Sequence, residues 1–165
     1  MTDPRVERLA ELLVDYSLGV QGGQLVRIDG SAEAAPLIVA AHRVALGRGA
    51  HPYAQVALDG LAELHVDRAC DEQLTYISPV ERAEMERLDA LLTIWSASNT
   101  RSFSRADPGR QGRYIAARRE LSRIRGERMA RGDMAWCGTL FPTEAHAQDA
   151  EMSLREYEDF VYRAC

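Results

Sequence analysis

Apolar and polar residues alternate along the chain with two periods, one typical of helices and one of strands. Asp3 is a typical helix-capping residue, and Pro4 follows it at the first helical position. Apolar residues then recur at helical spacing, and this predicts a helix that ends near Gly19. The apolar positions are Val6, Leu9, Ala10, Leu13 and Tyr16. Residues 25–28 then predict a short strand, residues 34–46 a largely buried helix, and residues 53–58 a second strand.

The middle of the chain continues this alternation. Two short helical pieces are predicted between residues 60 and 77, and a capping box at Ser78 and Glu81 predicts a helix that runs to about Arg87. Residues 89–95 are almost continuously apolar, which is the composition of a central strand in a parallel sheet. A polar loop follows, and Asp107-Pro108 predicts an arginine-rich helix with Gly126 as its weak point.

The last segment predicts one more strand and two more helices. Residues 134–140 have the composition of a fourth strand, and a short helix is expected after Thr143. A second capping box, at Ser153 and Glu156, predicts a final helix with an apolar stripe at Leu154, Tyr157, Val161 and Ala164. This helix reaches Cys165 without a glycine cap, so we expect it to be cut short.

Helices and strands that alternate with short loops predict an α/β fold. We expect a small parallel sheet of about four strands flanked by helices, in a flavodoxin- or Rossmann-like three-layer arrangement. A length of 165 residues fits a single domain with a sizeable core.

Composition narrows the function classes. The chain is 46% hydrophobic and 27% charged, with a net charge of −5, so no overall positive field would attract nucleic acid or an anionic membrane. The arginines between residues 110 and 131 alternate with acidic residues and predict a solvated helix face. No signal peptide or membrane-spanning run is found, and Cys70, Cys137 and Cys165 show no paired spacing. A cytoplasmic protein with reduced thiols is expected.

The residues give little sign of a catalytic centre. None of the four histidines, His42, His51, His65 and His146, follows another at the spacing of a helical metal site, so no metal ligand is assigned and no catalytic residue is named. The chain has no G-x-S-x-G elbow, and its only glycine-rich segments precede strands, which is the wrong side for a dinucleotide turn. No cofactor is expected to bind this chain.

The loop after the third predicted strand is the best candidate for ligand contact, because ligands of open α/β sheets gather beyond the carboxyl ends of the strands. Arg101 would pair with a carboxylate such as that of a peptide, and Asn99 would orient it, with Thr100 between them. Thr139 on the fourth strand is a further candidate. The alternative is a capped surface turn with a solvated arginine.

Several segments of the chain, in the same order, resemble the aminopeptidase T / aminopeptidase S family of metallo-aminopeptidases, also called thermophilic metalloproteases. The segments are residues 3–18, 49–52 (GAHP), 71–74 (DEQL), 97–101 (ASNTR), 136–143 (WCGTLFPT) and 147–165. The resemblance implies an enzyme that removes N-terminal residues from peptides with two divalent metal ions (Zn, Co or Mg). It also implies that the metal ligands lie in a later half of the family's longer chains, and that the enzyme is a homodimer.

The resemblance therefore implies the N-terminal, non-metal-binding domain of such an enzyme, inactive alone, that shapes the substrate chamber and packs against a missing C-terminal catalytic domain. Two alternatives remain: a free-standing flavodoxin-like domain that binds a small ligand, and an oligomerisation domain. The final helix offers a test. Tyr157, Phe160, Val161 and Tyr162 should all be packed in a self-contained domain and open in one that lacks a partner.

Overall fold

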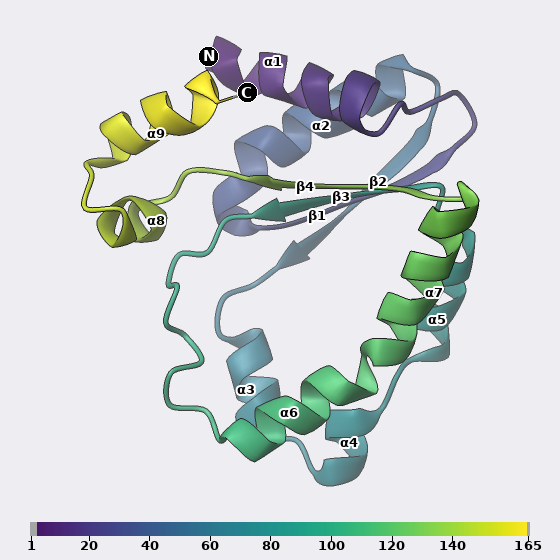
Figure 1. Cartoon of the computed structure of the whole chain (residues 1–165), viewed down its shortest axis with the longest axis vertical. Helices are drawn as coiled ribbons and strands as arrows, with labels where there is room; N and C mark the ends of the chain where they lie inside the picture. Colours follow the sequence, from purple (N-terminus) through teal and green to yellow (C-terminus); the bar gives the residue numbers. More distant parts are fainter. Residues whose placement is uncertain (1–2, 165) are drawn as a thin grey trace.

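The computed structural model describes residues 3–164, which form a four-stranded parallel sheet with helices on both faces (Figure 1). The strands are β1 (Leu25–Ser31), β2 (His51–Ala57), β3 (Ala90–Trp95) and β4 (Ala135–Leu140), and their order in the sheet is β2-β1-β3-β4. This confirms the predicted α/β class, the three layers and the four parallel strands. The most apolar strand, β3, is central as expected.

One face of the sheet carries the main core. Helix α1 (Pro4–Glu11), the π-helix η1 (Leu12–Ser17) and helix α2 (Ala35–Gly47), which follows the short η2 (Ala32–Ala34), cover this face. Alternate strand residues point into it, so Val26 and Ile28 of β1 are each only 1% exposed. Burial of these aliphatic side chains is the main stabilising contribution to the domain.

The first helix differs from the prediction in one respect. Tyr16, expected on the apolar stripe, is 84% exposed, whereas Val14 and Leu18 are buried. The cause is η1, because its wider π turn rotates the following side chains out of the α-helical phase. The predicted helix at 34–46 is buried on its sheet side, but Val39 and Leu46 face outward.

The opposite face is only partly covered. Helix α5 (Pro79–Arg87) packs with helix α7 (Arg119–Arg131) over the amino-terminal half of the strands. A small second core forms there around Met85, Leu88 and Leu91. Helices α3 (Leu61–Arg68), α4 (Asp71–Thr75) and α6 (Pro108–Ala117) form a separate group at the bottom of Figure 1. The face is therefore open beside the carboxyl half of the strands.

The arginine-rich helix was predicted to weaken at Gly126, and this was wrong. The break lies at Arg118, between α6 and α7, while Gly126 lies inside α7. The amide of Arg118 bonds back to the carbonyl of Ile115, and its guanidinium Nη1 donates to the carbonyl of Tyr114 at 3.3 Å. These bonds allow α6 to turn toward α3 and α4 while α7 packs with α5.

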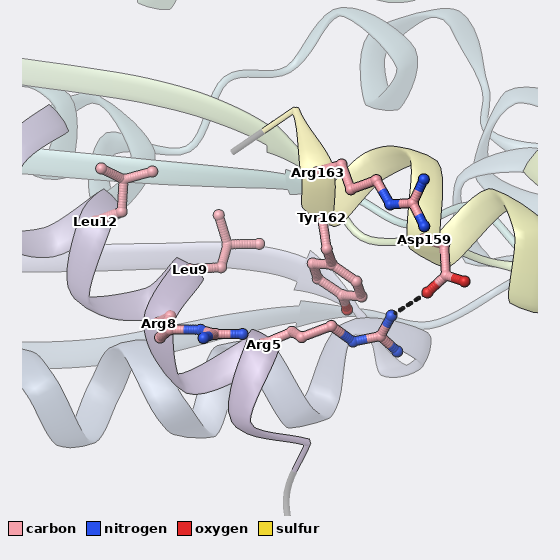
Figure 2. A pocket seen from close by; sticks show the side chains of 7 residues that line it. All are labelled: Arg5, Arg8, Leu9, Leu12, Asp159, Tyr162 and Arg163. Carbon is pink, nitrogen blue, oxygen red and sulfur yellow. Dashed lines mark hydrogen bonds and ion pairs between the residues drawn. The ribbon is translucent and has the colours of Figure 1, made fainter.

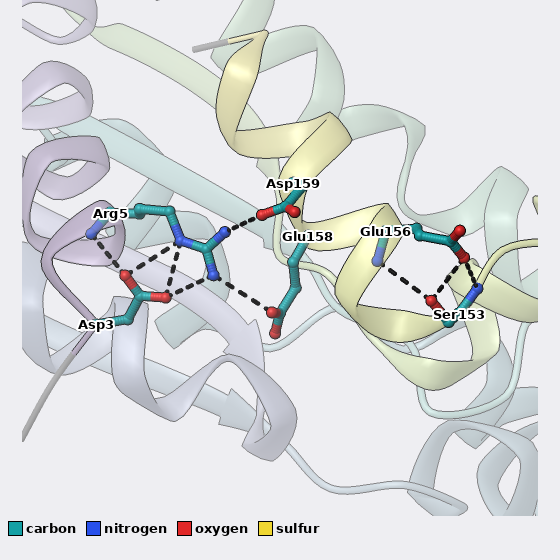
Figure 3. Close-up of polar contacts among 6 residues, drawn as sticks. All are labelled: Asp3, Arg5, Ser153, Glu156, Glu158 and Asp159. Carbon is teal, nitrogen blue, oxygen red and sulfur yellow. Dashed lines mark hydrogen bonds and ion pairs between the residues drawn. The ribbon is translucent and has the colours of Figure 1, made fainter.

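The chain ends in α8 (Glu144–Asp149) and α9 (Leu154–Arg163), and α9 lies beside α1 (Figure 3). Arg5 of α1 joins the two helices, because it contacts Asp159 at 2.7 Å and Glu158 at 3.4 Å, both in α9. It also contacts Asp3, the N-cap of its own helix, at 2.8 Å. Its guanidinium also lies 4.8 Å above the ring of Tyr162. At the other end of α9, Ser153 and Glu156 form the predicted capping box.

The test offered by the final helix gives a mixed result. Tyr162 packs against the main core, and Tyr157 and Val161 are half-buried, but Phe160 is 61% exposed. The helix is therefore attached to the domain through one side, and its other side faces outward. Cys165, where the cut end was expected, lies outside the described residues.

Candidate functional site

A cavity of about 830 Å³ lies on the open face of the sheet, between the carboxyl ends of the strands and the helices α3, α6 and α7. We call it the switch-point cleft. The chain passes from β1 to β2 on one side and later to β3 on the other, so the connections diverge between β1 and β3. In open α/β sheets ligands bind at this point, beyond the carboxyl ends of the strands.

Two serines occupy the point of divergence. Ser31 ends β1 and Ser96 follows β3, and both line the switch-point cleft. The hydroxyl of Ser31 donates to the carbonyl of Ser96 at 2.6 Å and lies 2.8 Å from the Ser96 hydroxyl, which accepts from the amide of Ser31 at 3.2 Å. Ser96 is 4% exposed. The pair fixes the two strand ends against each other.

A buried ionic network forms the floor. Arg27 of β1 donates to Glu84 of α5 at 2.6 Å and to Asp29 at 2.9 Å, and the hydroxyl of Tyr53 donates a short hydrogen bond to Glu84. Burial raises the pKa of Asp29 despite the nearby Arg27, and burial and the bond to Glu84 raise the pKa of Tyr53. Burial opposes the charge of Arg27, but Asp29 and Glu84 outweigh it and raise its pKa.

Arg118, at the break before α7, and Arg125, in the middle of α7, form the wall opposite the strands. The guanidinium of Arg118 lies 3.6 Å from the centre of the Tyr114 ring, and that of Arg125 lies 5.5 Å from the centre of the Trp136 ring. Both side chains are half-buried. A histidine on α3, His65, contacts Tyr114 edge to face at 5.6 Å, and its buried Nε2 has no hydrogen-bond partner within residues 3–164.

The loop candidates predicted from the sequence lie outside this cleft. Asn99 accepts from the amide of Arg101 at 2.9 Å, and Thr100 donates to Asp149 of α8 at 2.6 Å. Arg101 lies 3.6 Å from the same Asp149 carboxylate, with its side chain 80% exposed. Thr139 is half-buried on β4, in register with Ile94. The structure thus brings two of the four candidates, Thr100 and Arg101, to Asp149, and Asn99 bonds to the amide of Arg101.

The cleft residues themselves were missed at the sequence level, although two signals pointed to them. Arg27 and Asp29 alternate with Val26 and Ile28, which marks one face of β1 as polar. A serine also lies at the end of β1 and another directly after β3. Arg118 and Arg125 could not be distinguished from the other arginines, because only the turn between α6 and α7 directs them to the cleft.

A smaller cavity of about 520 Å³ lies between α1 and α9 (Figure 2). Its walls combine the apolar Leu9 and Leu12 with Tyr162 and three arginines. One of these, Arg5, is already held by the carboxylates of α9 (Figure 3). This cavity is therefore a gap at the interface between two packed helices, α1 and α9.

The described residues do not provide a metal site. Within residues 3–164, no three His, Cys, Asp or Glu side chains are grouped so that they could hold an ion. His51 is exposed at the start of β2, His42 is half-buried in α2, and His146 lies 6.4 Å from Tyr157, ring centre to ring centre. The donors in the described residues do not fit a pair of divalent ions. No helix in the described part of the chain is both long and apolar enough to cross a bilayer.

A parallel α/β domain with a cleft at its switch point is the class that the fold defines. The sequence model of the thermophilic metalloprotease (M29) family matches residues 2–165, and the chain belongs to that family. Among curated proteins, none matches the sequence.

The chain also matches solved structures. Wild-type AmpT from Thermus thermophilus superposes with a TM-score of 0.74 at 21% identity, over 98% of this chain and 42% of that chain. This likeness supports the fold, and the chain spans less than half the length of that relative. An alcohol dehydrogenase superfamily protein from Novosphingobium aromaticivorans overlaps 96% of this chain and 47% of that one at 18% identity, but its TM-score of 0.36 carries no argument.

Proposed function

We propose that this chain forms the N-terminal, non-metal-binding domain of a metal-dependent aminopeptidase that removes N-terminal residues from peptides. The observation that carries the proposal is the family match over residues 2–165, combined with a structural likeness that covers only 42% of the AmpT chain. A further, metal-binding domain would contain the catalytic centre. Two divalent ions bound there (Zn, Co or Mg) would activate a water molecule and polarise the scissile carbonyl.

In this proposal the domain shapes one wall of the substrate chamber. Asn99, Thr100 and Arg101 remain the candidates for contact with a peptide, with Thr139 nearer the sheet. The ion pair of Arg101 with Asp149 is long, at 3.6 Å, and exposed, so a peptide carboxylate could replace it at little cost. The outer side of α9, with Phe160 61% exposed, is a candidate surface for the catalytic domain or for a homodimer contact. The proposed location is the cytoplasm.

The proposal predicts that the 165-residue chain does not hydrolyse peptides alone. The test is to incubate the purified chain with Zn²⁺ or Co²⁺ and leucine para-nitroanilide, with metal-only and chelator-treated samples as controls. The expected rate equals that of the metal-only control. Metal-dependent turnover that follows the chain through two successive columns would overturn this part of the proposal.

The domain assignment has its own test. The coding sequence that follows codon 165 should encode a region with clustered Glu, His, Tyr and Asp, and the longer product should release para-nitroaniline when loaded with metal. A longer product that binds metal but is inactive on all aminoacyl anilides would contradict the aminopeptidase assignment.

A free-standing domain that binds a small ligand is the second candidate, and the switch-point cleft is the observation that favours it. In that case a ligand would bind to the isolated chain with no further domain needed.

A further inference from the structure

Within the described part of the chain, Arg118 and Arg125 have no carboxylate in direct contact, although the charge of Arg125 acts on Asp29 at longer range and partly offsets the raised pKa of that carboxyl. No carboxylate within residues 3–164 forms an ion pair with either guanidinium, and each lies instead against an aromatic ring. Both are half-buried and line the switch-point cleft. Nη1 of Arg118 already donates to the carbonyl of Tyr114 at 3.3 Å. A guanidinium held against a ring keeps its other outward N–H groups available, and these match a carboxylate in a two-bonded geometry.

The acidic groups of the cleft are already satisfied. Asp29 and Glu84 are bound by Arg27, and Glu81 accepts from the amide of Ser78 at 3.1 Å in the α5 capping box. Their direct contacts are therefore with other groups, and Asp29 is influenced by an arginine of the opposite wall, Arg125, at longer range. They also disfavour a nucleic acid, because it carries a phosphate at every nucleotide and would bring several negative charges to these three carboxylates in a chain of net charge −5. A short peptide can place a carboxylate at each arginine and apolar groups elsewhere.

The rim of the cleft is apolar. Val56 and Leu58 at the end of β2, Leu61 of α3 and Trp95 of β3 line the cleft, and each leaves between 47% and 60% of its surface exposed. Apolar side chains gathered on one exposed rim mark a binding surface more often than single ones do. A ligand that covers this rim must present apolar groups close to its negative charge.

We propose that the switch-point cleft binds a short acidic peptide, with one Glu or Asp carboxylate on Arg118, another on Arg125, and neighbouring apolar side chains on the rim of Val56, Leu61 and Trp95. A volume of about 830 Å³ lies within the range of known ligand sites. The charge complementarity of the arginines selects the carboxylate, and the apolar rim distinguishes a peptide from a bare anion.

The test titrates the whole chain with the doubly blocked peptide acetyl-Leu-Glu-Leu-Glu-Leu-amide and with its isosteric Gln counterpart. Binding is followed by calorimetry and by tryptophan fluorescence, because Trp95 lines the cleft and Trp136 lies beneath Arg125. The Glu peptide should bind at least roughly tenfold more tightly than the Gln peptide, as expected for a charge-assisted contact. Both ends are blocked, so an aminopeptidase could not cleave either probe, and failure of the proposed catalytic function would leave this result unaffected.

Matched variants locate the site. Arg118→Gln and Arg125→Gln should each remove most of the preference for Glu, whereas Arg119→Gln should keep it, because Arg119 does not line the cleft. Trp95→Ala should weaken both peptides alike. Near-ultraviolet circular dichroism checks that each variant is folded, and the Glu-against-Gln comparison in the unmodified chain needs no variant.

Five results would overturn the proposal, and four of them come from the titrations. They are equal binding of the two peptides, absence of binding by both, a Glu preference that survives in the Arg118→Gln/Arg125→Gln double variant, and full displacement of the Glu peptide by an equal concentration of inorganic phosphate. The last would indicate a bare anion site. A dimer in light scattering that excludes the peptide would show that a second copy covers the cleft, and this too would overturn it.

Discussion

Gly138 of β4 lies against the indole of Trp95 so closely that a β carbon at this position would stand 2.5 Å from Cη2 of that ring. The same β carbon would stand 3.2 Å from Cζ2 of Trp136. The absence of a side chain thus allows the two indoles to meet edge to face, with their centres 6.4 Å apart. Trp136 is further fixed because its Nε1 donates to Thr93 at 3.1 Å. Gly138 therefore determines the position of Trp95 on the rim of the switch-point cleft.

Gly138→Ala should destabilise the fold by about 1–3 kcal/mol, the usual cost of an overpacked position, and should change the tryptophan fluorescence. Urea unfolding measures the first effect and an emission spectrum the second. In a Trp95→Leu background the same substitution should cost much less, because the clashing ring atoms are gone. An equal cost in both backgrounds would show that the destabilisation does not come from a clash with Trp95.

Arg27 is the central residue of the buried network, with only 11% of its side chain exposed. Arg27→Met should destabilise the protein by about 3 kcal/mol at pH 7, because Asp29 and Glu84 would lose their shared cation. The triple variant that also carries Asp29→Asn and Glu84→Gln should recover part of this loss. Urea midpoints measure the stability of both variants. A triple variant less stable than Arg27→Met alone would show that the destabilisation does not come from unpaired charge.

The cost of Arg27→Met should also depend on pH. Burial already raises the pKa of Asp29, and loss of the Arg27 cation would raise it further. A carboxyl whose pKa is raised on folding stabilises the fold fully below its unfolded pKa, about 4, and loses this contribution as pH rises through its folded pKa. The difference in unfolding free energy between the variant and the parent chain should therefore be smaller at pH 4 than at pH 7. A difference that is constant with pH would exclude Asp29 as its source.

Much of the fold could be predicted because its signals are local. Capping residues such as Ser78 and Ser153 mark helix starts through hydrogen bonds within four residues, and the apolar run of β3 marks a central strand. The phase change at η1 could not be predicted, since a π turn leaves no mark in the spacing of apolar residues before Leu13. Tyr16 was therefore placed on the wrong side of its helix.

The switch-point cleft was less predictable because it depends on tertiary packing. The strand order places Ser31 beside Ser96, 65 positions apart in sequence, and the turn at Arg118 directs two arginines toward them. The loop around Arg101 could be placed from the sequence at the carboxyl end of β3, but its bonds to Asp149 come from α8, almost 50 residues later. Neither relationship is visible in local spacing.

Arg5→Gln should loosen α9 without unfolding the domain. The variant loses the ion pairs to Glu158 and Asp159 and the contact with the Tyr162 ring, which together connect α9 to α1 (Figure 3). Hydrogen exchange of the amides in 154–163 should become several-fold faster, while exchange in the strands should stay unchanged. Arg8→Gln is the control, because Arg8 lines the same cavity but forms no ion pair within the described residues. Equal acceleration in both variants would contradict a specific role for Arg5.

Gly126 and Gly132 should respond to alanine in opposite directions. Gly126 lies inside α7 with open space where a β carbon would be added, so Gly126→Ala should stabilise the protein by about 0.5–1 kcal/mol through helix propensity. Gly132 ends the same helix in the left-handed region at φ 76°, where a β carbon is strained, so Gly132→Ala should cost about 1–2 kcal/mol. Thermal and urea unfolding measure both. A destabilising Gly126→Ala would mean that the helix does need a break at that position, as the sequence alone had suggested, and would place the turn at Arg118 in question.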